Sequence, residues 1–299
     1  DLHPRVRRQR QMCIRDRSLS ARASAELTAY DAIFITGGSS GIGEAFLRDA
    51  LSCGSSRVFN ISRTPPAQSL QSLRKFSHIP CDLTDEASIL NLFERLKHEF
   101  EDLDKLCSDK YARPPRVLLV NNAGFGLYGP FPEPNIGRNT DMISLNVSAL
   151  TRLCAEFLPI IKRGRGSIIN ISSVAAFEPC PVRAVYAATK AYVKSLSLSL
   201  SYELGKFGCK CLCVCPGPTS SNFYKTAGFD EPPLSCGLWN VPVDISHAAY
   251  AALAKGKVLL VVGFQNRLLE FLSRILPTRF MLTCSGMILE RVRGGSKSK

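Results

Sequence analysis

The segment TGGSSGIG, residues 36–43, stands between a short apolar run and a helical pattern. The run DAIFIT (31–36) is typical of a buried strand, and GEAFLRDALSCG after the last glycine is typical of a helix. Glycines in such a turn let the backbone approach a pyrophosphate, and the positive end of the helix faces its charge. The spacing Gly37-x3-Gly41-x-Gly43 differs from the G-x-G-x-x-G fingerprint. The strand–turn–helix context nevertheless predicts a dinucleotide site.

Short apolar runs and helical patterns alternate along the rest of the chain. Further strand candidates are RVFNIS (57–62), FSHIPCDL (76–83), RVLLVNNAG (116–124), GSIINISS (166–173), KCLCVCPG (210–217) and KVLLVVG (257–263). Helical patterns lie at 85–100, where Thr84 can cap the helix, at 139–163, and from 185 to about 205. This alternation predicts an α/β fold with a Rossmann-like, doubly wound parallel sheet of about seven strands, covered on both faces by helices.

The chain has 299 residues, 45% of them hydrophobic, which is enough for one large core. We assign 29–263 to a single folded domain, 264–293 to a helical extension and 294–299 to a disordered tail. Residues 1–28 are excluded as a disordered or non-native tail, because RQRQMCIRDRS has no folding pattern. The alternative for this arginine-rich segment is a transit peptide.

The net charge of +13 is concentrated at the two ends of the chain. Residues 1–22 hold seven arginines and two acids, and residues 291–299 hold four basic residues and no acid. The body between these ends is nearly balanced in charge. We therefore expect no nucleic-acid partner.

The 12 cysteines show no disulfide-framework spacing, which indicates a reducing intracellular compartment. The cytoplasm is expected first, with an organelle or a membrane-peripheral position as alternatives. Cys209, Cys211, Cys213 and Cys215 alternate along one strand candidate, so we interpret them as small core residues and not as a zinc site. The histidines, at 3, 78, 98 and 247, fall outside every motif. No metal is expected.

The segment VYAATKAYV (185–193) places Tyr186 and Lys190 on one face of a helix. A free phenol has a pKa near ~10 and is a poor acid–base catalyst at neutral pH. The spacing alone favours a packing tyrosine beside a surface lysine, so other motifs have to show whether the pair is catalytic.

Several motifs in one order give the chain a resemblance to the short-chain dehydrogenase/reductase family. They are TGGSSGIG (36–43), CDL (81–83), NNAG (121–124), Asn146, the serines of ISS (172–173), YAATK (186–190) and PG (216–217). The resemblance covers about residues 30–263. NNAGFGLYGPF and CPGPT look most like a single-domain, NADP-preferring subgroup related to 3-oxoacyl and hydroxysteroid reductases.

The resemblance implies four catalytic residues, Asn146, Ser173, Tyr186 and Lys190. Tyr186 would be the general acid–base, and Lys190 would lower the pKa of Tyr186 and hold the nicotinamide ribose. Ser173, thirteen residues before the tyrosine, would hydrogen-bond the substrate carbonyl oxygen. Asn146 would bend its helix and hold a water in a proton relay to Lys190.

The cofactor residues implied by the resemblance come from every motif. They are Gly37, Ser39, Ser40, Gly41, Ile42, Gly43, Arg63, Asp82, Leu83, Asn122, Ala123, Gly124, Tyr186, Lys190, Pro216, Gly217 and Thr219. Asp82 would contact the adenine and Thr219 the carboxamide, while Ser221 replaces the family's usual threonine. NAD-selective sites carry an acid at the end of the second strand; here Ser62 stands there and Arg63 follows, which favours NADP over NAD.

These matches imply an NADP-dependent oxidoreductase that transfers a hydride between nicotinamide and the carbonyl or alcohol of an apolar substrate in lipid metabolism, such as a 3-oxoacyl compound or a steroid. A catalytically silent NADP-binding regulator or scaffold is the alternative. A sugar-nucleotide epimerase or dehydratase would usually carry a longer substrate domain. The apolar substrate is expected from loop aromatics, Phe125, Tyr128, Phe131, Phe177, Phe223, Tyr224, Phe229 and Trp239. The alternative is that several of them only pack the loops.

Residues 264–293 add a broad apolar stripe beyond the shared sheet, and such a surface must be covered. We expect a lid over the substrate cleft beside 222–247. The alternatives are a second subunit and an anionic membrane, which would suit Arg267, Arg274, Arg279, Arg291 and Arg293. We also expect a homo-oligomer.

Overall fold

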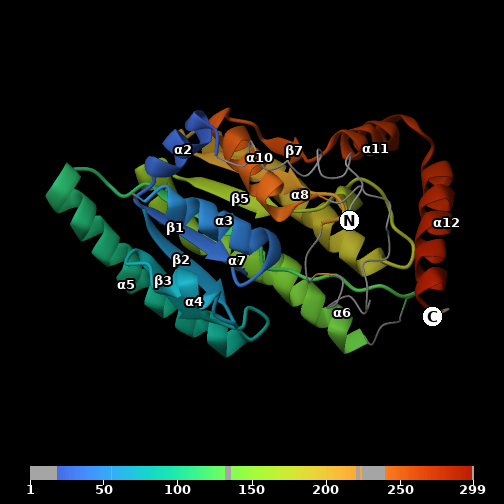
Figure 1. The fold of residues 1–299 in the computed structure, drawn as a ribbon, viewed down its shortest axis with the longest axis horizontal. Helices are drawn as coiled ribbons and strands as arrows, with labels where there is room; N and C mark the ends of the chain where they lie inside the picture. Colours follow the sequence, from blue (N-terminus) through green and yellow to red (C-terminus); the bar gives the residue numbers. More distant parts are fainter. Residues whose placement is uncertain (1–18, 55, 132–135, 220–222, 224–239, 298–299) are drawn as a thin grey trace, which may run out of the picture.

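The computed structural model describes residues 19–54, 56–131, 136–219, 223 and 240–297, with side chains described up to Glu290. A parallel sheet of seven strands forms its centre (Figure 1). The strands are β1 (Ala32–Thr36), β2 (Arg57–Ser62), β3 (Phe76–Pro80), β4 (Val117–Asn121), β5 (Ser167–Ile171), β6 (Lys210–Cys215) and β7 (Leu259–Val261), in the spatial order β3-β2-β1-β4-β5-β6-β7. They lie within the predicted segments, several of them shorter, so the predicted doubly wound α/β fold is confirmed.

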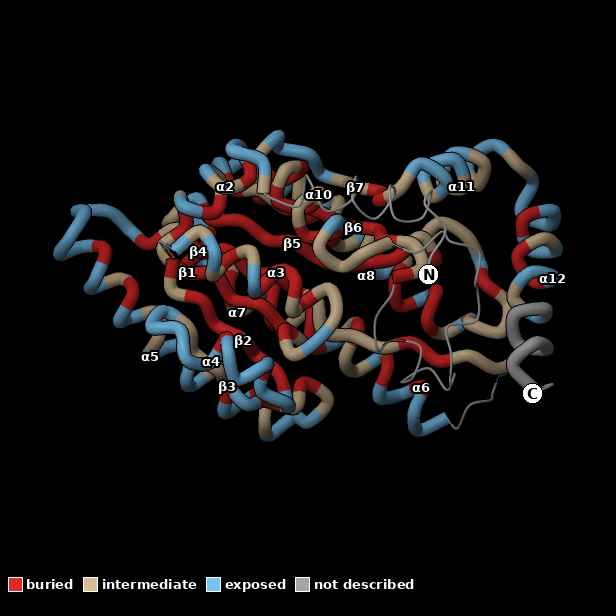
Figure 2. The backbone as a smooth tube through the Cα atoms, viewed as in Figure 1, coloured by how far each residue is buried: buried red, intermediate tan, exposed pale blue. Residues whose placement is uncertain are grey.

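Helices cover both faces of the sheet (Figure 1). They are α2 (Ala21–Thr28), α3 (Gly41–Ser52), α4 (Gln68–Gln71), α5 (Glu86–Tyr111), α6 (Ile136–Ile143), the π-helical η1 (Ser144–Ala149), α7 (Leu150–Gly164), the 3-10 turn η2 (Val174–Ala176), α8 (Ala184–Gly205), α10 (Pro242–Ala254), α11 (Phe264–Ile275) and α12 (Thr278–Lys297). One core cluster joins the strands to α2, α3 and α10 through residues such as Phe46 and Tyr250. The other joins them to α5, α7 and α8 through residues such as Phe157 and Leu200. The strands are consequently buried between two layers (Figure 2).

The strand order reverses in the middle of the sheet, because β1 pairs with β2 on one side and with β4 on the other. At such a switch point the loops after the two strands diverge to opposite faces and leave a crevice at the carboxyl ends. Here those ends are Thr36 and Asn121. The fold therefore offers a ligand crevice directly beside the glycine turn.

Helix α5 differs from its prediction at both ends. The predicted cap, Thr84, instead donates to Asp82 through its hydroxyl at 2.6 Å. Asp85 is the cap, because its carboxylate accepts a hydrogen bond from the backbone N–H of Ser88 at 2.7 Å. The helix also continues beyond residue 100 to Tyr111, since its buried face continues through later apolar residues.

The helical pattern predicted at 139–163 belongs to one longer run, in which α6, η1 and α7 follow each other without a break. This run, Ile136–Gly164, is long enough to cross a membrane, and an 18-residue window in it has a mean hydropathy of 1.2, which is apolar enough to do so. However, Leu153, Phe157 and Ile161 are buried against the sheet. The run is therefore a core helix. Its π-helical turn contains Asn146, and such turns often occur at functional sites.

The exclusion of 1–28 from the folded domain was wrong for its last part. Residues Ala21–Thr28 form α2, and Ser20 caps the helix by accepting a hydrogen bond from the N–H of Ala23 at 3.3 Å. Leu27 of this helix is fully buried against the sheet. Residues 1–18 lie outside the described part of the chain.

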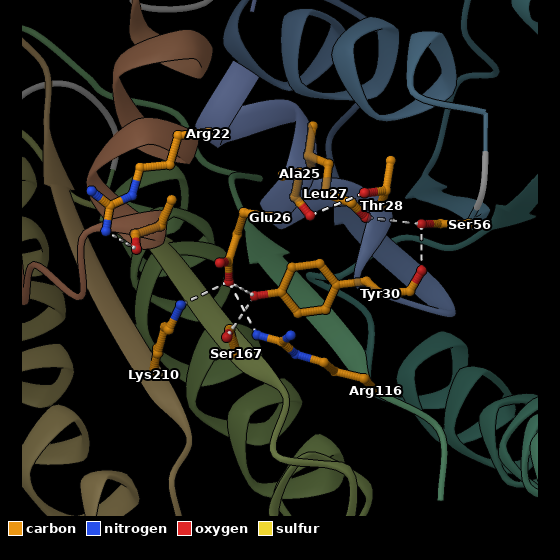
Figure 3. A network of polar contacts seen from close by, with 11 residues as sticks. Arg22, Ala25, Glu26, Leu27, Thr28, Tyr30, Ser56, Arg116, Ser167 and Lys210 are labelled. Atoms are coloured by element: carbon orange, nitrogen blue, oxygen red, sulfur yellow. Dashed lines mark hydrogen bonds and ion pairs between the residues drawn. The ribbon is translucent and has the colours of Figure 1, made fainter. Parts of the chain in front are cut away.

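A polar network ties α2 to the amino ends of two strands (Figure 3). One carboxylate oxygen of Glu26 accepts from Lys210 Nζ at 2.9 Å, from Arg116 Nη2 at 3.2 Å and from the Tyr30 hydroxyl at 2.8 Å. The Tyr30 hydroxyl also lies 2.7 Å from Ser167 Oγ. The helix is therefore anchored by both charge and burial.

Two helices, α11 and α12, follow β7 and stand at one end of the molecule (Figure 1). No residue of α11 is buried. On α12, Met281 and Ser285 are buried and face the body. The helix continues to Lys297, so the disordered tail predicted at 294–299 was wrong as far as that residue, because each further helical residue adds one backbone hydrogen bond to a helix already formed.

Candidate active site

The carboxyl ends of the central strands open into one cleft with a volume of about 610 Å³. Most of the predicted cofactor residues line it, namely Gly37, Ser39, Ser40, Gly41, Ile42, Arg63, Asp82, Leu83, Asn122, Ala123, Gly124, Tyr186, Lys190, Pro216, Gly217 and Thr219. Ser173 lines the same cleft. Of the predicted site residues, Gly43 and Asn146 are not part of the wall, and Ser221 lies outside the described residues.

The glycine turn brings α3 against the strand that precedes it. Gly37 has a φ of +67°, a left-handed conformation that favours glycine. A Cβ on Gly43 would lie 2.2 Å from the Gly37 carbonyl oxygen and 2.4 Å from Asn122 Nδ2, so no larger residue fits there. The Asn122 amide donates to the carbonyls of Thr36 and Gly37, at 3.1 Å each. Gly43 thus shapes the cleft from behind its wall.

The amino end of α3 fits an anionic group. Ser40 stands at the N-cap with extended backbone, and no side chain caps the helix. Ser39, Gly41 and Ile42 beside it line the cleft. The first backbone N–H groups of a helix have no intrahelical partner, and the helix dipole favours negative charge there. This end of the cleft can therefore hold the pyrophosphate of a dinucleotide.

Arg63 lies at the rim of the same end, after β2. Its side chain is 73% exposed, and Nη1 lies 3.5 Å from a carboxylate oxygen of Asp82. Burial acts to raise the pKa of Asp82, but hydrogen bonds from Thr84 and the charge of Arg63 lower it overall. Ser62 donates to the Thr64 carbonyl and offers no carboxylate. Where β2 ends, the site therefore has a long, exposed cationic side chain, Arg63, and no carboxylate at position 62.

Ser173, Tyr186 and Lys190 meet on one wall of the cleft, where β5 ends. Ser173 caps η2, and its Oγ accepts a hydrogen bond from the N–H of Ala175 at 3.2 Å. Tyr186 lies in the first turn of α8, and the Ser173 side chain acts to lower the pKa of its phenol, against the larger effect of burial. Lys190 follows one turn later and donates from Nζ to the Ile171 carbonyl at 3.0 Å. The fold thus brings a hydroxyl, a phenol and an ammonium together.

Burial shifts both titratable groups of this wall. It raises the pKa of Tyr186, because the phenolate is poorly solvated there. It lowers the pKa of Lys190 to about 8. The prediction named Lys190 as the cation that lowers the Tyr186 pKa. In the structure the nearer cation is Arg183, whose guanidinium lies 4.5 Å from the tyrosine ring centre, against 5.8 Å for Lys190 Nζ.

Asn146 lies behind this wall and connects it to the loop that follows β4, at Phe125. Its amide donates to the Phe125 carbonyl at 2.9 Å and to Thr189 Oγ1 at 3.1 Å, and its oxygen accepts from the Phe125 N–H at 3.1 Å. A Cβ on Gly124 would lie 2.8 Å from this oxygen and 3.4 Å from Lys190 Nζ. Asn146 lies in a π-helical turn. The predicted bend of the helix and the predicted water relay stay predictions.

The far end of the cleft is lined by apolar and aromatic side chains, Phe125, Tyr128, Leu145, Phe223 and Leu289. Three of the predicted aromatics are among them. Phe131 is 67% exposed and does not line this cleft. Phe177 packs against Cys213 and Cys215 of β6. The remaining three, at 224, 229 and 239, lie outside the described residues.

Sequence reasoning missed Arg138 and Arg183, which also line the cleft. Arg183 stands three residues before Tyr186, a helical spacing that could have pointed to it. Arg138 lies over the ring of Phe125 at 5.4 Å. Leu289 of α12 also lines the cleft, and it belongs to the segment 264–293 that was expected to form a lid.

A glycine turn at the switch point of a doubly wound sheet, together with a serine, a tyrosine and a lysine at one carboxyl end, defines a nicotinamide-dependent oxidoreductase. The family model of the short chain dehydrogenases matches residues 31–231. The chain belongs to this family, whose members act on alcohols and carbonyls.

Similar proteins include curated enzymes and solved structures. The chain is 31% identical to serine 3-dehydrogenase of Agrobacterium fabrum over 208 residues, which are 67% of this chain and 77% of that protein. It is 28% identical to 3-ketodihydrosphingosine reductase of Bacteroides thetaiotaomicron over 200 residues, 67% of this chain and 68% of that protein. It also resembles a solved short-chain dehydrogenase of Sphingobium yanoikuyae in complex with NADPH, with a TM-score of 0.66, 27% identity and coverage of 79% of this chain and 90% of that one.

Proposed function

We propose that the chain is an NADP-dependent carbonyl reductase whose substrate carries its ketone on an apolar body. One observation carries the proposal: Ser173, Tyr186 and Lys190 share a wall that faces an apolar end of the cleft. The bound cofactor would supply the hydride. The Ser173 and Tyr186 hydroxyls would both reach the carbonyl oxygen, and Tyr186 would donate its proton to it.

Burial raises the pKa of Tyr186, which keeps the phenol protonated and able to donate but also makes it a weaker acid, so its phenolate needs stabilisation. Once the proton has left, the buried Lys190 ammonium and the Arg183 guanidinium would stabilise the phenolate. Both groups lie beside the Tyr186 ring, at 4.5 Å and 5.8 Å from its centre for Arg183 and Lys190. The wall is therefore preorganised for proton transfer.

NADP is proposed over NAD because of the end of β2. Arg63 can reach a 2′-phosphate, and Ser62 provides no carboxylate for a 2′-hydroxyl. The solved relative from Sphingobium yanoikuyae was in complex with NADPH, which agrees with this assignment.

The apolar substrate is supported by the far end of the cleft. Phe125, Phe223 and Leu289 line it, and Phe223 lies 5.6 Å from Tyr186 between ring centres. A ketone with a hydrocarbon chain would bury that chain against these residues. The relative from Bacteroides is a reductase of a keto-sphingosine, and a substrate of that kind fits this surface.

A second candidate is a small carbonyl compound that carries a carboxylate. Arg183 lies 4.3 Å from the ring centre of Tyr128 and 4.5 Å from that of Tyr186, and Arg138 lines the same cleft. Guanidinium groups bind carboxylates in a bidentate manner. The relative from Agrobacterium is a serine dehydrogenase, whose named substrate is an amino acid.

The test is a set of rate measurements with NADPH on the purified chain. Its substrates are methyl ketones of increasing chain length, and oxo acids paired with their methyl esters. The main proposal expects kcat/KM to rise with chain length. If the second candidate is right, kcat/KM for the oxo acid should exceed that for its methyl ester. Arg183→Met should then remove this difference in kcat/KM.

Tyr186→Phe is the matching control for the chemistry. It should lower kcat by at least about 10²-fold, because the proton donor is lost, and should leave the NADPH dissociation constant unchanged. If the phenylalanine variant reduced the best ketone at the wild-type rate, the proposed acid would be wrong.

A further inference from the structure

Helix α11 carries a continuous apolar stripe that faces away from the body. Its members, Phe264, Leu268, Phe271 and Ile275, follow each other at helical spacing. Their exposed fractions are 79%, 48%, 56% and 60%. Scattered apolar residues on a surface are ordinary, but a whole helix face of this kind marks an interaction site.

Helix α12 carries further exposed apolar side chains, while its other face is docked on the body. Ser285 Oγ donates to the Pro179 carbonyl at 3.3 Å, and Met281 is buried, so one face is held on the body. Phe280, Met287 and Ile288 on the same helix are 54%, 52% and 58% exposed. The two helices form one end of the molecule (Figures 1 and 2). The apolar surface is therefore an outer face and not a gap in the core.

The same helices are strongly basic. Residues 264–297, which contain both helices, hold six arginines and lysines and two acids. One acid, Glu270, already pairs with Arg274. Arg267 and Arg279 form no ion pair with any residue of the described part of the chain. Apolar and cationic side chains thus lie on the same two helices, where the second acid, Glu290, is also exposed.

We propose that α11 and α12 seat the protein on an anionic lipid surface. Amphipathic helices with aromatic and leucine side chains on one face and arginines beside them bind at the boundary of headgroups and acyl chains. A second copy fits less well, because a two-fold contact would bring the same cations against each other. A lid fits only part of the surface, since the α11 stripe does not line the cleft.

The surface adjoins the cleft. Leu289 of α12 lines the cleft, and Asn266 of α11 lies against Gly217, where a Cβ would meet its amide at 2.3 Å. A membrane-dissolved ketone would therefore reach the cleft at the lipid boundary. Entry of such a ketone from the membrane rests on the proposed function, whereas binding of the protein to lipid does not.

The test is co-sedimentation of the full chain with vesicles of phosphatidylcholine alone or mixed equally with phosphatidylglycerol. We expect binding to the mixed vesicles, weakened by salt and by Arg267→Glu with Arg279→Glu. Phe264→Asp with Phe271→Asp should lower the bound fraction by about tenfold or more, because burying one such ring contributes more than a factor of ten in an equilibrium constant.

Matched controls are Tyr202→Asp, an aromatic 73% exposed on α8, and Arg74→Glu with Arg95→Glu, two exposed arginines elsewhere. These variants should bind like the wild type. The proposal is overturned if the full chain does not sediment with anionic vesicles, or if the double phenylalanine variant binds unchanged. It is also overturned if light scattering shows that the wild type is a dimer and that Phe264→Asp with Phe271→Asp makes it a monomer. A second copy of the chain would then cover the apolar stripe of α11.

Discussion

Lys190 is a buried ammonium whose environment disfavours its charge. Burial lowers its pKa from 10.5 to about 8 in the folded chain. Between these two values the unfolded chain binds more protons than the folded one. The stability of the fold should therefore rise as the pH increases from about 8 to 10.5, and this contribution is lost as the pH falls through 8.

Lys190→Met should remove this dependence, because methionine keeps the length of the side chain without its charge. Relative to the variant, the wild type should gain on the order of 3 kcal/mol in free energy of unfolding across that window. Urea unfolding at a series of pH values measures it, and Lys255→Met, at an exposed position, is the control. Parallel pH curves for Lys190→Met and wild type would contradict the shift.

Arg63 carries the choice between the two nicotinamide cofactors. Arg63→Ala should weaken NADPH by about 1.5–3 kcal/mol, the value of a charge-assisted contact to phosphate, and should leave NADH nearly unaffected. Fluorescence titration of both cofactors measures the difference. Arg63→Lys should restore part of the NADPH affinity, and an equal loss of both cofactors would argue against this role.

At the level of elements, α2 is anchored by one carboxylate. Glu26→Gln removes the charge that faces Lys210 and Arg116 while it keeps the shape of the side chain. We expect a loss of about 1–3 kcal/mol in the free energy of unfolding, because both partly buried cations lose their counterion. Chemical denaturation measures the loss.

Glu94→Gln provides the control for this prediction. Glu94 pairs with Lys97 on the exposed side of α5, where solvent screens the pair. The control should leave the unfolding midpoint unchanged. An equally small effect for Glu26→Gln would mean that burial of Leu27, and not the ion pairs, holds α2.

At the level of the whole molecule, α12 closes the cleft from a distant part of the chain. Leu289 packs beside Tyr186, Leu127 and Met142. Leu289→Ala should raise KM for a bulky apolar ketone by about fivefold or more, because the substrate loses an apolar contact, and should spare the NADPH affinity.

The neighbouring Ile288→Ala is the matched control, since Ile288 is 58% exposed and does not line the cleft. Its KM should equal that of the wild type. Truncation after Gly263 should raise KM in the same sense as Leu289→Ala. If both variants kept the wild-type KM for a water-soluble ketone, α12 would have no part in substrate binding.

Much of the fold could be predicted because its signals are local. The alternation of strand and helix follows from periodicity, the turn at 36–43 needs glycine for backbone reasons, and the Tyr186–Lys190 spacing is one helical turn. Ser173 could be named only from the order of the family motifs, because it is thirteen residues from Tyr186 along the chain.

The remaining features depend on contacts between distant segments. α2 looked like part of a tail because its stability comes from Lys210 and Arg116, far along the chain. Leu289 belongs to the segment 264–293 that was expected to form a lid, but only the packing of α12 on the body decides that this residue reaches the cleft. The sequence alone therefore established the sheet, the cofactor turn and the reactive pair, whose causes lie within a few residues of each other. The anchoring of α2 and the closure of the cleft needed the folded chain, because packing between remote segments is set by their shapes in space and not by local order.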